Sequence, residues 1–131
     1  MRQGFLEFHS TEEELLEGLN EEQREAVKFG EGPCLVVAGA GTGKTLVITR
    51  RIAYLITKKI CKPEEILALT FTEKAAREME ERVDRLVPYT YSYSQISTFN
   101  SFGETILKEY FMELGFPMNF KLLDEMGQAI F

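Results

Sequence analysis

Residues 38–45 have the sequence AGAGTGKT, a glycine-rich stretch that ends in a lysine and a threonine. Glycines let the backbone curl so that its amides converge on one point, and a helix that begins beside them adds partial positive charge. In such a cradle Lys44 would hold the β- and γ-phosphates of a nucleotide, and Thr45 would ligate magnesium. The spacing matches the pattern G-x-x-x-x-G-K-[ST] except at its first position, where Ala38 replaces glycine. The stretch therefore predicts a phosphate site, with a purely structural glycine turn as the alternative.

Two further stretches, LTFTEKAAREM and STFNSFGETIL, each end an apolar run with Thr-Phe and pass directly into a helical pattern. Phe71 and Phe99 stand where an aromatic ring would leave the core, and one of them could stack on a nucleic-acid base. Thr72 and Ser101 could hold a phosphate together with free helical amides. Core phenylalanines and ordinary helix caps remain the alternative interpretation of both stretches.

A glutamine upstream of the glycine-rich stretch is a third candidate. Gln23 lies in LNEEQREAV, and its amide offers both a donor and an acceptor to an adenine edge. It also follows Asn20 by three residues, as in a capping box, so both interpretations stay open.

Apolar patterning predicts the elements that position these residues. Short apolar runs predict buried strands at 34–38, 65–71 and 94–99, and residues 119–125 could form a fourth before a terminal helix. Helical patterns follow the first three runs, over about 44–57, 72–86 and 100–114. Capping boxes at Thr11 and Asn20 open two short helices before them.

The three longer helices carry distinct apolar patterns. The helix over 72–86 is expected to have one apolar stripe, with its charges on the other side, formed by Ala75, Ala76, Met79, Val83 and Leu86. The helix over 44–57 is apolar on nearly all sides, which predicts deep packing. The helix over 100–114 is expected to turn five side chains inward: Phe102, Ile106, Leu107, Tyr110 and Phe111.

Alternating strands and helices predict an α/β fold with a parallel sheet and helices on both faces. Ligands in such sheets bind beyond the carboxyl ends of the strands. The glycine-rich stretch and the two Thr-Phe stretches should therefore share one edge of the sheet.

Composition sets bounds on the class of protein. The 131 residues suffice for one domain, 44% are hydrophobic and 27% charged, and no apolar run is long enough to span a membrane. The net charge of −6 is confined to residues 1–31, which hold nine acidic and three basic residues, so charge neither supports nor excludes a polyanionic partner. The stretch MRQGFLEFHSTEEE has no apolar central segment, so we do not expect it to act as a secretory signal. Cys34 and Cys61 are expected to be reduced packing residues of a cytoplasmic protein.

In order, LNEEQREAV, AGAGTGKT, LALTFTEKAAREMEERV and ISTFNSFGETIL resemble the Q motif and motifs I, Ia and Ib of superfamily 1 DNA helicases of the UvrD/Rep/PcrA type. The resemblance runs from about Leu19 to the C-terminus. It implies that residues 1–131 are the N-terminal part of the first RecA-like, ATP-binding motor domain, with residues 1–18 as an acidic extension. It also implies ATP and Mg²⁺ as cofactors, single-stranded DNA and the second RecA-like domain as partners, and 3′ to 5′ movement.

The resemblance further implies roles for individual residues. Lys44 and Thr45 would act in catalysis, with Thr45 on magnesium. Nucleotide binding would involve Gln23, Ala38, Gly39, Ala40, Gly41, Thr42, Gly43, Lys44, Thr45 and Leu46. DNA binding would involve Thr70, Phe71, Thr72, Thr98, Asn100 and Ser101. The family commonly has His where Asn100 stands and often Arg where Leu46 stands, which places one DNA contact and one nucleotide contact in question.

Hydrolysis in this superfamily needs an Asp-Glu pair at the end of a strand, followed closely by Gln-Asp. Asp124 and Glu125, with Gln128, imitate this motif, but the preceding apolar run is short and the glutamine falls one place late. We interpret the pair as a decoy and expect this chain alone to be inactive. The alternatives are a RecB/AddA-type helicase–nuclease subunit and a nucleotide-binding module without turnover; a generic P-loop kinase gives the Thr-Phe stretches no role.

Overall fold

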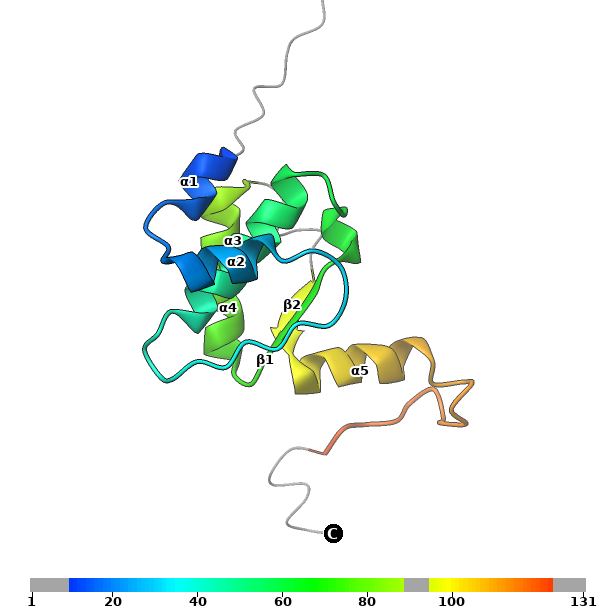
Figure 1. Ribbon diagram of the computed structural model, residues 1–131. Coiled ribbons are helices and arrows are strands. Elements are labelled where there is room, and N and C mark those ends of the chain that lie inside the picture. Colours follow the sequence, from blue (N-terminus) through cyan, green and yellow to red (C-terminus); the bar gives the residue numbers. More distant parts are fainter. Residues whose placement is uncertain (1–9, 89–94, 124–131) are drawn as a thin grey trace, which may run out of the picture.

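The computed structural model describes residues 10–88 and 95–123 (Figure 1). In chain order the elements are α1 (Glu12–Leu16), α2 (Glu21–Lys28), α3 (Lys44–Thr57), the 3₁₀ turn η1 (Pro63–Glu65), β1 (Leu67–Thr70), α4 (Glu73–Leu86), β2 (Gln95–Thr98) and α5 (Phe99–Glu109). The predicted helix over 44–57 is confirmed at both ends.

The two strands form a parallel pair joined by α4. Their register places Thr70 opposite Thr98, so both strands end at the same edge and each leads at once into a helix. Ala68 and Ile96 are also register partners, and they share the face that packs on the core. The prediction of a parallel sheet with flanking helices is confirmed, with both strands shorter than their apolar runs.

The core lies among α1, α2, α3, α4 and the sheet. The predicted apolar stripe of α4 is confirmed, because Ala76, Met79 and Val83 are buried. Met79 and Val83 belong to one apolar cluster with Leu15, Leu19, Val27, Ile52, Ala53, Tyr54, Ile66, Val87 and Ile96. Amphipathic helices thus obtain their stability from one shared apolar face.

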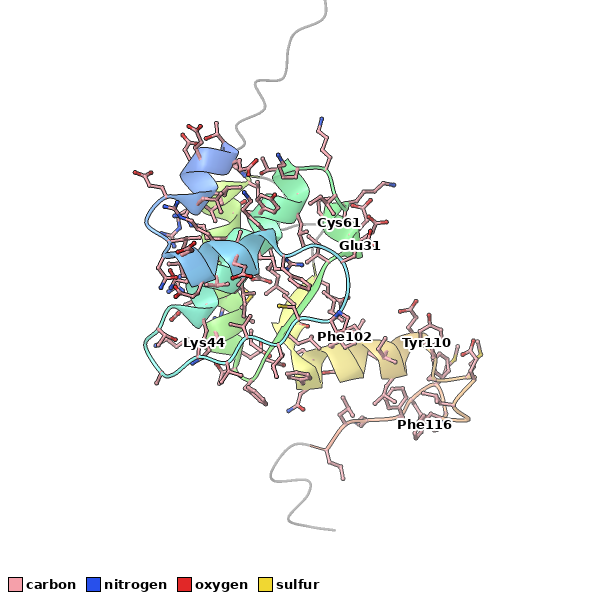
Figure 2. All side chains as sticks on the ribbon, in the orientation of Figure 1. Glu31, Lys44, Cys61, Phe102, Tyr110 and Phe116 are labelled. Atoms are coloured by element: carbon pink, nitrogen blue, oxygen red, sulfur yellow. The ribbon has the colours of Figure 1, made fainter. Side chains whose placement is uncertain are left out.

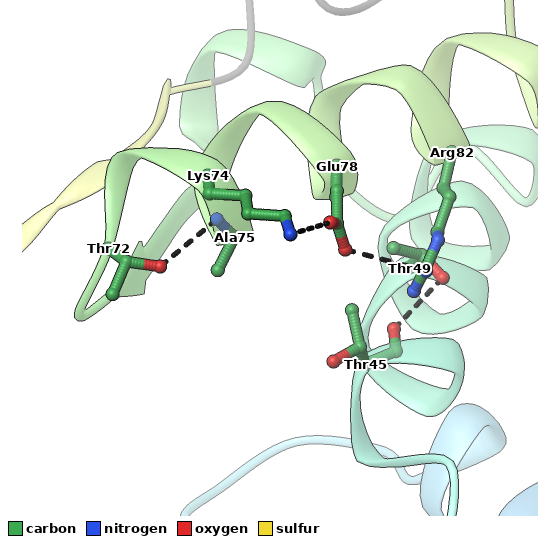
Figure 3. Close-up of polar contacts among 7 residues, drawn as sticks. All are labelled: Thr45, Thr49, Thr72, Lys74, Ala75, Glu78 and Arg82. Carbon is green, nitrogen blue, oxygen red and sulfur yellow. Dashed lines mark hydrogen bonds and ion pairs between the residues drawn. The ribbon is translucent and has the colours of Figure 1, made fainter.

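The contact between α3 and α4 has a polar border. Figure 3 shows a row of Lys74, Glu78 and Arg82 along α4, joined by ion pairs of 4.0 and 3.7 Å. Arg82 reaches over α3 near the buried Thr49, whose hydroxyl donates to the carbonyl oxygen of Thr45 at 3.0 Å. Exposed pairs of this kind contribute little to stability, so the apolar contact beneath them holds the two helices together.

Side chains cap the starts of α1, α2, α4 and α5. Each accepting side chain bonds the backbone amide three residues later, from Thr11, Asn20, Thr72 and Thr98. Both predicted capping boxes are confirmed. The helix α3 differs from these four, because its N-cap is Gly43 and no side chain accepts a hydrogen bond there.

Arg51 fastens the end of α2 to α3. Its guanidinium donates to three carbonyl oxygens, with the shortest bond to Phe29 at 2.8 Å, and it lies over the Phe29 ring at 5.9 Å. These contacts satisfy carbonyl groups that the helix itself leaves without partners.

The predicted buried strand over 34–38 is wrong. No strand is assigned there, Leu35 and Val37 are 87% and 88% exposed, and in the described residues the sheet consists of β1 and β2 alone. An apolar run becomes a buried strand only where neighbouring strands satisfy its backbone groups. Cys34 is exposed, contrary to the prediction that it packs, whereas Cys61 packs against the core.

The helix α5 ends at Glu109, earlier than predicted, and the expected inward packing is also wrong. Figure 2 shows Phe102 and Tyr110 along this helix, and α5 contains no buried residue. The helix contacts mainly β1 and β2. These two strands are too small a surface to bury its apolar side chains. The possible fourth strand is absent over 119–123, and the rest of that segment, with Asp124, Glu125 and Gln128, lies outside the described residues.

The deep packing predicted for α3 holds on one side only. Thr49, Ile52, Ala53 and Tyr54 are buried, whereas Ile48 is 45% exposed. In the part of the chain that the structure describes, no helix has the length and apolar character needed to cross a membrane.

Candidate functional site

The glycine-rich stretch forms a turn directly before α3. Gly41 and Gly43 have φ values of 74° and 85°, a left-handed conformation that other residues rarely adopt. The hydroxyl of Thr42 donates to the carbonyl oxygen of Gly39 at 2.7 Å and closes the turn on itself. The sequence AGAGTG therefore forms a tight loop because its glycines accept angles that a Cβ would oppose.

Lys44, the first residue of α3, lies over this loop (Figure 2). Its Nζ atom donates to the carbonyl oxygens of Ala38 at 2.9 Å and Gly39 at 2.6 Å. The lysine is exposed, and these partners are neutral, so its full positive charge stays available to an anion that enters the loop. Together with the uncapped amides of α3, the donor set fits the phosphates of a nucleotide.

Gln23 connects α2 to the loop. Its Oε1 atom accepts a hydrogen bond from the backbone amide of Asn20 at 3.0 Å, which completes the capping box. Its Nε2 atom donates to the carbonyl oxygen of Thr42 at 3.0 Å. The capping interpretation is confirmed, and the contact with adenine stays a prediction.

A cavity of about 610 Å³ lies beside the loop. It is lined by α2, the extended segment 34–38 and α3, and it includes Gln23, Lys44 and Arg51 among mostly apolar groups. A mostly apolar hollow with a few convergent polar groups is typical of a small-molecule site. The cavity thus adjoins the candidate phosphate site on the side where Gln23 lies.

The second part of the candidate site is the edge of the sheet where β1 and β2 end. Phe71 and Phe99 lie with their ring centroids 5.4 Å apart and their planes tilted by 38°. Phe71 is 92% exposed and Phe99 is 53% exposed, so neither is a core residue. The core interpretation of these phenylalanines is wrong, because each follows the last strand residue at the sheet edge.

The hydroxyl groups at this edge mainly form hydrogen bonds within the protein. Thr70 is buried and donates to the carbonyl oxygen of Thr72 at 3.0 Å. Thr72 and Thr98 accept bonds from the amides of Ala75 and Ser101, each at 3.1 Å, and so cap α4 and α5. Helix capping is therefore confirmed for Thr72, whereas the cap of α5 is Thr98 and not Ser101 as the sequence suggested. DNA contacts at these positions remain predictions.

Glu73, a residue that the sequence analysis did not single out, joins the two helix starts. Its Oε1 atom accepts hydrogen bonds from the hydroxyls of Ser101 at 2.8 Å and Thr98 at 3.0 Å. Hydrogen bonds from Ser101 and then Thr98 lower the pKa of the Glu73 carboxyl, because they favour its charged form. The register of Thr70 with Thr98 places these helix starts together, and an acidic residue at the first position of α4 could have indicated the contact.

The remaining predicted residues lie around these two centres. Leu46 is 37% exposed in the first turn of α3, and Thr45 is half-buried with its carbonyl oxygen accepting from Thr49. Asn100 is exposed in the first turn of α5. Figure 1 shows the glycine loop and the starts of α3, α4 and α5 at the same end of the fold.

A glycine-rich loop under Lys44, followed by two parallel strands that each lead into a helix, is consistent with a partial RecA-like α/β domain. Residues 19–131 match the family described as UvrD/REP helicase N-terminal domain, and the chain belongs to this family. Among its relatives are proteins named ATP-dependent DNA helicase PcrA. The chain is 50% identical over 115 residues to that of Bacillus subtilis and 49% identical over 114 residues to that of Staphylococcus aureus. These alignments cover 88% and 87% of this chain but 16% of each relative, so the chain spans about one sixth of their length.

Proposed function

We propose that this chain is the ATP-binding part of an ATP-dependent DNA helicase, and that residues 1–131 belong to its first motor domain. The full motor would move along single-stranded DNA, 3′ to 5′, and separate duplex strands. Family membership and the relatives named PcrA support this proposal. The motor would need a second RecA-like domain as its partner.

The start of α3 carries the proposal. The N-cap of α3 is Gly43, which has no side chain to accept a hydrogen bond, and Lys44 lies across the glycine loop that precedes the helix. Lys44 and the amides of the loop would bind the phosphates of ATP, and the hydroxyl of Thr45 would hold Mg²⁺. Bound magnesium would neutralise phosphate charge and orient the γ-phosphate for transfer to water.

The base of the nucleotide would occupy the cavity beside Gln23. That cavity is mostly apolar and lies between α2 and α3. To contact an adenine edge, Gln23 would exchange its bond with the carbonyl oxygen of Thr42 for one with the base. Leu46, with no polar atom in its side chain, would contribute apolar contact only.

The edge formed by the ends of β1 and β2 would hold single-stranded DNA. Phe71 is the exposed ring on which a base would stack, next to Phe99. Ser101 and Asn100, in the first turn of α5, would face the phosphate backbone together with Thr72 and Thr98. We expect the nucleotide and the DNA to bind at two separate places, the loop before α3 and the sheet edge.

We propose that this chain binds nucleotide without turning it over. The decisive experiment is calorimetric titration of the 131-residue chain with Mg-ATP, followed by an assay for released phosphate with and without an oligothymidylate. Binding without release is the expected result. Absence of binding by the folded chain would overturn the proposed function, and release of phosphate that Glu125→Gln abolishes would overturn the decoy interpretation of Asp124 and Glu125.

A further inference from the structure

The start of α5 has several features of an anion-binding site. It is the N-terminus of an 11-residue helix, where backbone amides carry partial positive charge, and two hydroxyls, those of Thr98 and Ser101, lie in it. The start of α4 adjoins it, because Thr70 and Thr98 end neighbouring strands. Two helix N-termini and two hydroxyl donors therefore meet at one point of the sheet edge.

The carboxylate of Glu73 already occupies this position between the two hydroxyls. Three oxygen atoms form a triangle: Glu73 Oε1 lies 2.8 Å from Ser101 Oγ and 3.0 Å from Thr98 Oγ1, and the two hydroxyl oxygens are 2.9 Å apart. Each hydroxyl has one hydrogen to donate, and Thr98 Oγ1 also accepts the bond that caps α5. While the carboxylate stays there, neither hydroxyl has a hydrogen left for a phosphate.

We propose that Glu73 acts as a built-in competitor of a DNA phosphate and thereby sets the affinity of the sheet edge for single-stranded DNA. This inference rests on the DNA-binding edge of the proposed function. A carboxylate and a phosphodiester are both oxyanions that accept hydroxyl donors, so the two would occupy the same place in turn.

The position of Glu73 suits an exchange of this kind. It is the first residue of α4, and its side chain is exposed, so it can rotate into solvent without disturbing the core. The buried stripe of α4 begins further along, at Ala76. On DNA binding, the hydroxyl of Ser101 would pass its hydrogen bond from the carboxylate to a phosphate oxygen, while Thr98 would keep its cap on α5.

Glu73→Gln tests the proposal. The variant keeps the size of the side chain and one acceptor oxygen but removes the charge that attracts the hydroxyls and repels phosphate. At a fixed salt concentration, its dissociation constant for fluorescent oligothymidylate should fall about two- to tenfold, the range of one regained hydrogen bond. Glu81→Gln is the matched control, because it makes the same charge change on the same helix away from the triangle.

The Ser101→Ala background separates local competition from general electrostatics. If a freed Ser101 hydroxyl binds phosphate, Glu73→Gln should give a smaller gain in Ser101→Ala than in the wild type. An equal gain in both backgrounds, or a gain of the same size in Glu81→Gln, would overturn the proposal. Circular dichroism checks folding, and if Glu73→Gln does not fold, Glu73→Asp takes its place, since its carboxylate is one methylene too short for both hydroxyls.

The outcomes also distinguish this inference from the function on which it rests. Wild type and Glu73→Gln with equal, measurable affinity would overturn the role of Glu73 and leave the DNA-binding edge standing. Absence of binding by every folded variant would overturn the DNA-binding edge and the competitor together. Binding that is seen only after Glu73 is replaced would support the inference in its strongest form.

Discussion

The starts of α3 and α5 form an instructive pair, because both are helix N-termini at the same end of the fold and only one is open. At α3, Gly43 is the N-cap, no side chain accepts from the first-turn amides, and Lys44 adds a positive charge. At α5, Thr98 caps the helix and Glu73 supplies a negative charge to the hydroxyls around it. The same helical partial charge is thus left for a ligand in one place and satisfied by the protein in the other.

The difference shows how local chemistry assigns roles to similar geometry. A glycine cap leaves several amides unsatisfied, which costs stability unless an anion binds. A threonine cap satisfies one of them and stabilises the helix by about 0.5–2 kcal/mol relative to alanine. The open helix therefore suits tight binding of a triphosphate, and the closed helix suits weak, exchangeable contact with a strand.

Removing the charge at the open end should have the largest effect. Lys44→Ala should weaken Mg-ATP binding about ten- to a hundredfold, since hydrogen bonds to charged groups are worth about 1.5–3 kcal/mol. The fold should be unchanged, because Lys44 is exposed. Calorimetric titration measures the affinity, and Lys74→Ala, at an 86% exposed lysine of α4, is the control. Unchanged affinity in folded Lys44→Ala would refute the phosphate site.

Removing one ring of the aromatic pair beside the start of α5 should have the second-largest effect. Phe71→Ala should weaken binding of oligothymidylate by about 1–3 kcal/mol, because one stacked base loses its ring. The melting temperature should hardly change, since the ring is 92% exposed.

Phe116→Ala is the matched control for this change. Phe116 is also exposed and also forms a tilted pair, with Phe120 at 5.6 Å. Fluorescence anisotropy compares the two variants, and an equal loss of affinity in both would contradict a specific stacking role for Phe71.

Adding a side chain at Gly43 should affect nucleotide binding less than the loss of Lys44 does, and it should also lower the stability of the fold. Gly43→Ala forces a Cβ into a residue with φ of 85°, which costs about 1–2 kcal/mol. That Cβ would also lie 3.0 Å from Nε2 of Gln23, a contact that pushes the two apart. We expect a lower melting temperature and weaker nucleotide binding by calorimetry. Gly103→Ala, inside α5 with nothing within 4 Å of the added Cβ, should not lower stability.

Removing the hydrogen bond between Gln23 of α2 and the glycine loop should have the smallest effect. Gln23→Glu keeps an acceptor for the amide of Asn20, so the capping box survives. It removes the donor to the carbonyl oxygen of Thr42, which should cost about 0.5–1.5 kcal/mol of unfolding free energy. Urea denaturation measures this loss. An unchanged midpoint of the urea transition would show that the hydrogen bond between Gln23 and the loop does not contribute to stability.

Local patterns in the sequence gave reliable predictions where neighbours along the chain decide the structure. Both capping boxes, the start and end of α3, and the buried stripe of α4 depend on residues three or four apart, and all are confirmed. The order of apolar runs and helices also predicted the parallel pair of β1 and β2.

Predictions that needed distant partners fared worse. Residues 34–38 are as apolar as a buried strand, yet Leu35 and Val37 stay exposed, because no described strand lies beside them. The apolar side of α5 was expected to be covered, and it is not. Apolarity records a tendency to be buried, but burial requires a second surface.

The sequence by itself determined the glycine-rich loop before α3, because glycines at fixed spacing and a lysine at the start of a helix act through local backbone geometry. It also determined the capping boxes that open α1 and α2 and the start of α3. Only the tertiary structure decided that Gln23 bonds the loop and that Glu73 holds Thr98 and Ser101. Those contacts join residues 19 to 28 positions apart. Packing of α2 against α3 brings Gln23 to the loop, and the parallel strands set the starts of α4 and α5 side by side.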